Sequence, residues 1–308
     1  MLLKKNIPIS YVFGKIKLEL ALLTGYSTVV YVAHVYFNYP GVSIPIAIPG
    51  ILGTVISLLL AFRSNQAYDR WWEARTLWGA IVNDSRSFAR QVLTFMDNIY
   101  EDEDKRAMKE RIIKRQMAWC YSLSQHLRGQ DAQQSLKNFV SDEERQALST
   151  MEHIPLGLME QHGNDLRLLL RMGWINEFQQ VAMDEMLSRF STSMGACERI
   201  KSTVFPVTYS VYIHFLVLLF VLILPFGLIE FFGIIQIPLV VAISSSFFLI
   251  EKMAIHLQDP FESKPTDTPT TSISRKIEQN LRQLLKDEYP VQPDPAAAVK
   301  DNAMFYIL

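Results

Sequence analysis

The sequence predicts an all-α membrane protein, with four transmembrane helices and a helical cytoplasmic region. Two contrasting patterns of charge predict this fold class. Residues 20–62, 202–229 and 231–250 contain no Asp, Glu, Lys or Arg, whereas residues 63–201 contain 19 Lys and Arg and 20 Asp and Glu. Charge-free runs of this length would expose a large apolar surface in water, so we expect lipid to cover them. A uniformly soluble domain is therefore excluded.

The overall composition excludes several other classes. The 308 residues carry a formal net charge of −1, which gives no argument for nucleic acid as a partner. The two cysteines, Cys120 and Cys197, both lie in the charged segment, 77 positions apart. They fit a reducing compartment and predict no structural disulfide.

Each span follows from the apolar runs and their breaks. The first run is too long for one span, and the turn-forming residues 38–43 divide it. Nothing in the sequence stops the second helix from continuing past Arg63 into the cytoplasmic region. The predicted spans are residues 18–37, 46–62, 204–225 and 234–255. The chain then divides into segments 1–17, 18–62, 63–201, 202–257 and 258–308.

The distribution of cations predicts the topology. Of the 30 Lys and Arg, four lie in the N-terminal tail, 19 in residues 63–201 and seven from Lys252 onward. The two hairpin loops between spans contain none. Because Lys and Arg in short flanking loops resist translocation, both termini and the middle segment are expected in the cytoplasm. We see no cleavable signal peptide.

Helical periodicity continues in the cytoplasmic segments. Residues 102–119 read as a charged amphipathic helix, and residues 177–200 carry an apolar stripe that predicts packing in a bundle. The stripe comprises Phe178, Val181, Met186, Leu187, Phe190 and Met194. After Asp259-Pro260-Phe261 we expect an extended strap over residues 262–274, rich in Thr, Pro and Ser, and then a short helix over 277–285.

No enzyme motif is present, and we expect neither catalytic residues nor a cofactor. Three histidines, His34, His214 and His256, lie in or beside spans, and two facing intramembrane histidines could bind haem. Their predicted depths in the membrane match poorly. A haem-binding redox protein, and a scaffold whose charged segment binds a partner, nevertheless remain the alternatives from other classes.

One face of the second span stands out. Thr54, Leu58 and Phe62 recur every four residues on one side of the helix and cover about 12 Å along its axis. In a monomer this face would contact lipid or other spans. In a symmetric oligomer with this helix nearest the axis, the same residues would form apolar rings that gate by dewetting.

Several motifs resemble the prokaryotic branch of the bestrophin family. They are the run FRSNQAYDRWWEAR at residues 62–75 followed by LWG at 77–79, the run GACERI at 195–200 followed by FPVTY at 205–209, and Asp259-Pro260-Phe261. Their order and spacing cover most of the chain, from about residue 8 to residue 285. The resemblance implies a homopentameric channel of the bacterial inner membrane, with one axial pore that has two narrow points. The implied partners are further copies of the chain, lipid and permeant ions.

The same resemblance assigns the two narrow points. The neck falls on Thr54, Leu58 and Phe62, although Thr54 departs from the family's apolar pattern. The cytoplasmic aperture falls on Phe178, with Glu177 beside it. The alternative for Phe178 is ordinary packing in the helical bundle.

The charge of the permeant ion has two possible interpretations, a cation and an anion. Animal bestrophins conduct anions, whereas prokaryotic relatives are associated with cations. A ring of Glu177 side chains would favour cations, which makes a cation channel the first interpretation and a chloride channel the alternative. Arg63 would favour anions if it faced the pore, but we expect it to anchor a contact between protomers.

The remaining residues are given structural roles. Trp71 and Trp72 are expected at the membrane interface, and Arg70 and Glu73 are expected to pair on one face of the helix. After Phe261, only Glu262 and Asp267 offer carboxylates, with a lysine between them. Because calcium collects six to eight oxygen ligands, we expect no calcium site and no other metal.

Overall fold

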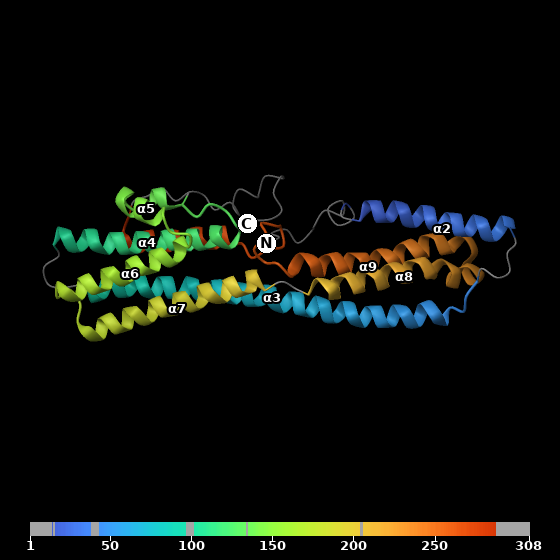
Figure 1. The fold of residues 1–308 in the computed structure, drawn as a ribbon, viewed down its shortest axis with the longest axis horizontal. Coiled ribbons are helices and arrows are strands. Elements are labelled where there is room, and N and C mark those ends of the chain that lie inside the picture. The colour runs from blue at the N-terminus through green and yellow to red at the C-terminus, as the bar shows by residue number, and fades with distance from the viewer. Residues whose placement is uncertain are drawn as a thin grey trace. The chain divides into compact units, whose positions relative to one another are not determined.

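The computed structural model describes residues 14, 16–37, 43–96, 102–133, 135–203 and 206–287, and these residues contain helices and no strand. The predicted all-α fold class is therefore confirmed (Figure 1). The helices are α2 (Lys17–Phe37), α3 (Ala47–Phe95), α4 (Glu103–Leu127), η1 (Leu136–Asn138), α5 (Asp142–Leu148), α6 (Ile154–Arg171), α7 (Glu177–Ser202), α8 (Val207–Phe232), η2 (Gly233–Ile235), α9 (Gln236–Leu257) and α10 (Thr270–Leu285).

The described residues divide into two compact units. The span unit comprises residues 16–71 and 206–259, and the bundle unit comprises residues 72–203 and 260–287. The boundary between them falls inside α3, at Trp71 and Trp72.

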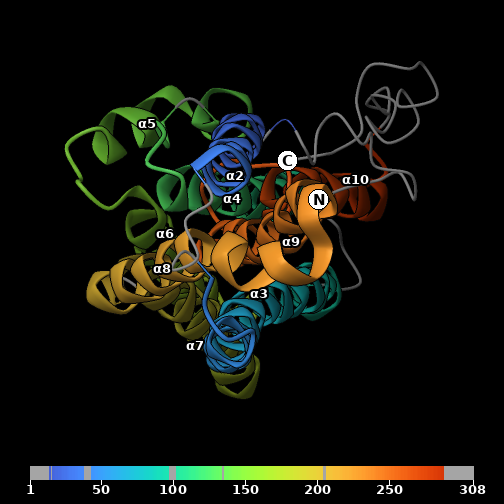
Figure 2. The ribbon, with the colours of Figure 1, turned by 90° about the vertical axis from the view of Figure 1, so that its right-hand side faces the viewer.

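The span unit holds the apolar helices. In Figure 1 they lie in the order α2, α9, α8, α3, and Figure 2 views them end-on. Among the described residues, three helical segments are long and apolar enough to cross a membrane: Lys17–Tyr36, Ala47–Phe95 and Val207–Leu257. The third of these segments contains two helices, α8 and α9, joined by η2.

Small residues allow α3 and α8 to approach closely. A Cβ atom at Gly53 would lie 3.1 Å from the ring of Phe220, and one at Gly227 would lie 2.6 Å from Pro49. Ile56 and Leu60 of α3 are buried in the same apolar core as Phe220. The close contact therefore fixes which face of α3 turns inward.

The predicted helix ends are partly right. The second helix does continue past Arg63, as expected, and reaches Phe95. The third helix was wrongly expected to end at Pro225, because proline removes only one helical hydrogen bond and α8 continues to Phe232. Gly233 follows as its C-cap, with a φ of 51°, a conformation that suits glycine.

Aromatic side chains fill the core of the bundle unit. Trp78 and Phe88 of α3, Trp119 of α4 and Phe190 of α7 are fully buried. The rings of Phe88 and Phe190 meet edge to face, 5.9 Å apart, and Trp119 lies 5.1 Å from Phe190. Met186, Leu187 and Met194 are buried beside them, so this part of the predicted stripe does pack in the bundle.

The segment after Phe261 differs from the expected strap. Helix α10 begins at Thr270, seven residues earlier than predicted, directly after Pro269. The early turns bury small hydroxyl side chains: Thr270 bonds Ser124 at 2.6 Å, and Ser274 donates to the carbonyl of Cys120 at 3.1 Å. Composition alone suggested a loop here because Thr and Ser are typical of loops, but buried hydrogen bonds keep them helical.

Candidate functional site

The structure brings Thr54, Leu58 and Phe62 together on one exposed face of α3. Leu58 is 59% exposed and Phe62 is 56% exposed in the protomer. Ile56 and Leu60, on the opposite side of the helix, are fully buried. Because successive residues turn by about 100° around a helix, burial of one side leaves the predicted neck residues on the outer side.

The Thr54 hydroxyl is satisfied within its own helix. It donates to the carbonyl of Gly50 at 2.9 Å. This bond back to the preceding turn offsets the polarity by which Thr54 departs from an apolar face.

Arg63 has a different role from the one predicted. It is 1% exposed inside the span unit, so the expectation that it anchors a contact between protomers is wrong. Its Nη2 donates to Oγ of Ser210 on α8 at 2.9 Å, and its Nη1 lies 3.8 Å from Oε1 of Glu251 on α9. Burying a cation within an apolar unit requires such partners, and Arg63 thereby joins α3 to α8 and α9.

Two further polar contacts surround this buried pair. Nδ1 of His214 lies 3.1 Å from Oε1 of Glu251, so this histidine, considered above for haem, contacts a carboxylate. Nζ of Lys252 pairs with Glu19 of α2 at 2.5 Å. The sequence reasoning missed Glu251. The sequence does offer a sign of this role, because Glu251 directly follows the charge-free run 231–250. A carboxylate at the end of such an apolar helix needs a partner when it is buried.

Glu177 and Phe178 lie at the start of α7. The side chain of Asn176 accepts from the backbone N–H of Gln179, and the side chain of Gln179 accepts from Asn176 in return, each at 2.9 Å. This capping box fixes the first turn of the helix. Phe178 is 87% exposed and Glu177 is also exposed, so the alternative that Phe178 packs in the bundle is wrong for the protomer.

The expected pair between Arg70 and Glu73 is replaced by other contacts. Nη2 of Arg199 binds Glu73 at 2.5 Å. Nε of Arg70 donates to the carbonyl of Gln258 at 2.8 Å, and its Nη2 lies 3.8 Å from Asp259. The spacing on α3 predicted the wrong pair because the partners come from other helices. Arg199 lies in the last turn of α7, and Gln258 and Asp259 directly follow α9.

The other predicted structural residues occupy varied environments. Trp71 is partly buried and Trp72 is 55% exposed. Phe261 is buried in the bundle core, and the carbonyl of Pro260 accepts from Thr268 at 3.1 Å. Phe261 and Pro260 therefore start a compact turn that leads to α10.

The carboxylates of this turn contact protein groups. Glu262 pairs with Lys201 at 2.6 Å, and this hydrogen bond lowers the pKa of Glu262. Asp267 accepts from the backbone N–H of Lys264 at 2.9 Å, and burial raises its pKa. The absence of a calcium site here stays a prediction.

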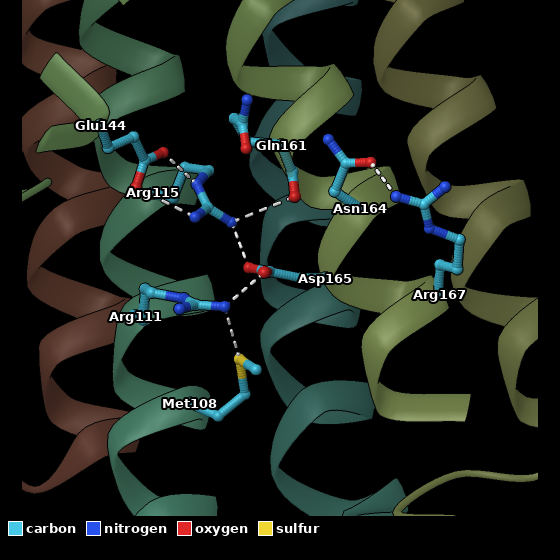
Figure 3. A network of polar contacts seen from close by, with 8 residues as sticks. All are labelled: Met108, Arg111, Arg115, Glu144, Gln161, Asn164, Asp165 and Arg167. Carbon is cyan, nitrogen blue, oxygen red and sulfur yellow. Dashed lines mark hydrogen bonds and ion pairs between the residues drawn. The ribbon is translucent and has the colours of Figure 1, made fainter. Parts of the chain in front are cut away.

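A buried ionic network ties three helices of the bundle unit together (Figure 3). The guanidinium of Arg115 on α4 binds Glu144 of α5 and Asp165 of α6, and Arg111 also binds Asp165. The side chain of Arg115 is 3% exposed. Because each charge in the buried part has an opposite charge, the network holds α4, α5 and α6 in one arrangement.

Comparisons with known proteins agree with this architecture. The family profile described as "Bacterial/Fungal Bestrophin protein" matches residues 6–283. The chain is 32% identical over 280 residues to a protein of Ralstonia nicotianae named as voltage-dependent anion channel-forming, covering 91% of this chain and 90% of the relative. It is also 32% identical over 246 residues to a Nostoc protein with the same description, covering 78% of this chain and 79% of that one.

Solved structures match along most of the chain. A crystal structure described as a bacterial bestrophin homologue from Klebsiella pneumoniae superimposes with a TM-score of 0.83. The two chains are 25% identical, and the match covers 89% of this chain and 100% of that one.

Proposed function

The chain belongs to the bacterial and fungal bestrophin family, and we propose that it forms a homopentameric ion channel whose single axial pore is lined by α3. The observation that carries this proposal is the exposed face of α3. Leu58 and Phe62 are more than half exposed in a helix whose opposite side is buried. In an assembly of several copies, this face would line the pore instead of contacting lipid.

The position of α3 in the span unit supports an oligomer. Helices α8 and α9 lie between α2 and α3, and Arg63 of α3 contacts both of them, which leaves α3 on the side of the span unit away from α2 (Figure 1). The side of α3 that is turned away from α8 and α9 can face a symmetry axis. The space between the four helices is filled by an apolar core, so conduction requires several copies around that axis.

The proposed neck is an apolar constriction. Five copies of Leu58 and of Phe62 would form two rings one helical turn apart, with Thr54 as the outermost ring. Apolar rings offer no groups to replace the water that an ion loses, so they oppose conduction until they widen. The bond from Thr54 to Gly50 reduces the polarity of the outermost ring.

The proposed second narrow point is formed by Phe178 and Glu177. A phenyl ring that is 87% exposed at a helix start is costly in water unless it serves a surface between copies or a constriction. Five copies of Glu177 beside it would form an acidic ring.

Two observations favour opposite signs for the permeant ion. The relatives of Ralstonia and Nostoc are named as anion channel-forming proteins, which favours an anion channel. The exposed carboxylate of Glu177 beside Phe178 favours cations, because an acidic ring raises the local concentration of cations. The reversal potential distinguishes the two.

The orientation in the membrane is part of the proposal. The absence of cations from both hairpin loops supports four spans with both termini in the cytoplasm of a bacterial inner membrane. Helices α8 and α9 would then each cross the membrane once.

Reconstitution in a planar bilayer under a salt gradient tests the proposal. We expect discrete currents, and the sign of the reversal potential gives the charge of the permeant ion. If Glu177 selects cations, Glu177→Gln shifts the reversal potential toward anions, whereas the matched control Glu185→Gln, an exposed carboxylate on the same helix, leaves it unchanged. Folded protein that inserts into the bilayer but carries no current would refute the channel.

A further inference from the structure

Two histidines and a glutamate from three helices meet on the bundle unit. His126 lies in the last turn of α4, His153 is the N-cap of α6, and Glu198 lies on α7. Nε2 of His153 is 2.7 Å from Oε1 of Glu198, and Nε2 of His126 is 3.9 Å from the same oxygen. One ligand atom from each residue lies within 4.8 Å of the others.

The surroundings leave this cluster open to a cation. Within the described part of the chain, the side-chain contacts of Glu198 are to the two histidines, and no Lys or Arg pairs with it. The adjacent Arg199 binds Glu73 instead. Each of the three side chains is about one-third exposed, so a dissolved ion can reach them.

We propose that His126, His153 and Glu198 form a zinc-binding site, with Nε2 of each imidazole and Oε1 of the carboxylate as ligands. Two imidazoles and one carboxylate are a ligand set that zinc takes in proteins. Hard cations such as calcium and magnesium prefer oxygen ligands and fit this set poorly. Three protein ligands leave the fourth tetrahedral position to water, so bound zinc can exchange.

The distances require only small movements. Ligand atoms about 2.1 Å from a tetrahedral zinc lie about 3.4 Å from one another. The separation of 2.7 Å between His153 and Glu198 must open, and the 3.9 Å between His126 and Glu198 must shorten. Rotation of the Glu198 side chain together with small rotations of the two imidazoles makes both changes, and the one-third exposure of these side chains leaves them room to move.

Zinc binding has a consequence for the start of α6. Nδ1 of His153 accepts a hydrogen bond from the backbone N–H of Leu156 at 3.1 Å, so the neutral ring carries its proton on Nε2. When Nε2 binds zinc, that proton moves to Nδ1, and the ring stays neutral. A protonated Nδ1 cannot accept from the backbone N–H of Leu156. Zinc binding through Nε2 therefore removes the hydrogen bond by which His153 caps α6.

Calorimetric titration of the chelator-treated, full-length protein in detergent tests the site, with zinc chloride as the probe. We expect one zinc per chain. Cobalt(II), titrated in parallel, should give the visible absorption of a tetrahedral complex. Wild-type protein that is folded and binds neither ion would overturn the proposal.

Three substitutions and one control separate this site from adventitious zinc. His126→Gln, Glu198→Gln and His153→Asn each remove one ligand, and asparagine keeps an N-cap acceptor for Leu156. Each should weaken zinc binding at least tenfold. The control His214→Gln alters a histidine that contacts a carboxylate in the span unit, and should leave binding unchanged. Zinc binding that survives His126→Gln combined with Glu198→Gln would overturn the assignment.

Two measurements keep the test independent of folding. Each variant should have a melting temperature close to that of the wild type without zinc. Zinc should raise the melting temperature of the wild type and of the control His214→Gln, and should raise that of the three ligand variants much less. Hydrogen exchange should quicken at the first turn of α6 on addition of zinc, since the cap from His153 is lost. Slower exchange at that turn would contradict binding through Nε2 of His153.

Discussion

Leu58 and Leu59 are neighbours in the sequence, yet the fold gives them different environments. Leu58 is 59% exposed on the outer face of α3, whereas Leu59 is partly buried against the core of the span unit. The difference arises from the turn of about 100° per residue in a helix. It allows the proposed neck to be tested by a comparison between adjacent positions.

Leu58→Ala and Phe62→Ala should each raise conductance or open probability in bilayer recordings, because smaller rings let water stay in the neck. Leu59→Ala should leave the current unchanged and lower the free energy of unfolding by about 2 kcal/mol through lost packing. Thr54→Ala should change conductance and open probability little. A current increase in Leu59→Ala, with none in the other two, would show that the assigned pore face is wrong.

His162 is a fully buried histidine in the bundle unit. Neither ring nitrogen has a hydrogen-bond partner among the described residues, and the ring meets Phe88 edge to face at 5.3 Å. Burial and the charge of Arg115 hold the pKa of His162 well below its ordinary value. Folding therefore keeps this imidazole neutral at a pH where the unfolded chain would protonate it.

This depressed pKa predicts sensitivity to acid. Below about pH 6.5 the unfolded state binds a proton that the native state does not, so the free energy of unfolding falls by up to about 1.4 kcal/mol per pH unit. His162→Leu and His162→Gln should both flatten the pH profile of thermal unfolding between pH 7 and 5. His162→Leu should also stabilise the protein at pH 7, since it removes two buried polar atoms without partners. An unchanged pH profile in both variants would exclude His162 as the cause.

At the scale of elements, the contacts of Arg115 determine how α4, α5 and α6 fit together (Figure 3). A buried ionic network adds little net stability compared with an apolar core of the same shape. Removal of one member is costly, however, because its partner then stays buried without an opposite charge.

Arg115→Ala should therefore lower the free energy of unfolding of the bundle unit by roughly 3 kcal/mol. Arg115→Lys should recover only part of this loss, because an ammonium group cannot bind two carboxylates with the geometry of a guanidinium. The matched control Arg167→Ala, whose guanidinium bonds Asn164 one turn away on the same helix, should cost less than 1 kcal/mol. Equal losses in Arg115→Ala and Arg167→Ala would contradict the role given to the network.

At the scale of the whole molecule, the proposed channel depends on assembly. The outer face of α3 exposes Leu58, Phe62, Ile51 and Val55 in one protomer. Burial of such apolar side chains between copies is favourable, and a closed ring leaves no copy with an unpaired surface.

Native mass spectrometry in mild detergent should accordingly give a particle of about five times 35.4 kDa. Phe62→Glu should reduce the pentamer or block its current, since five carboxylates would crowd one ring. A monomer or dimer as the largest wild-type species would contradict the axial pore as proposed.

The sequence by itself determined the helical fold class, the family and the continuation of α3 beyond Arg63. These features depend on local signals: charge-free runs, helical periodicity and short motifs that survive without knowledge of distant contacts. Periodicity also isolated the outer face of α3, because the alternation around a helix is written in consecutive residues. The exposed side chains of the fold agree with that face.

Only the tertiary structure decided the partners of polar residues. Arg63 meets Glu251, Glu73 meets Arg199, and His126 and His153 meet Glu198, across separations of 45 to 188 positions along the chain. No local spacing records such pairs, because they depend on how whole helices pack. The end of α8 and the start of α10 were missed for a related reason: Pro225 and Thr270 lie in helices that tertiary contacts stabilise against their local preferences.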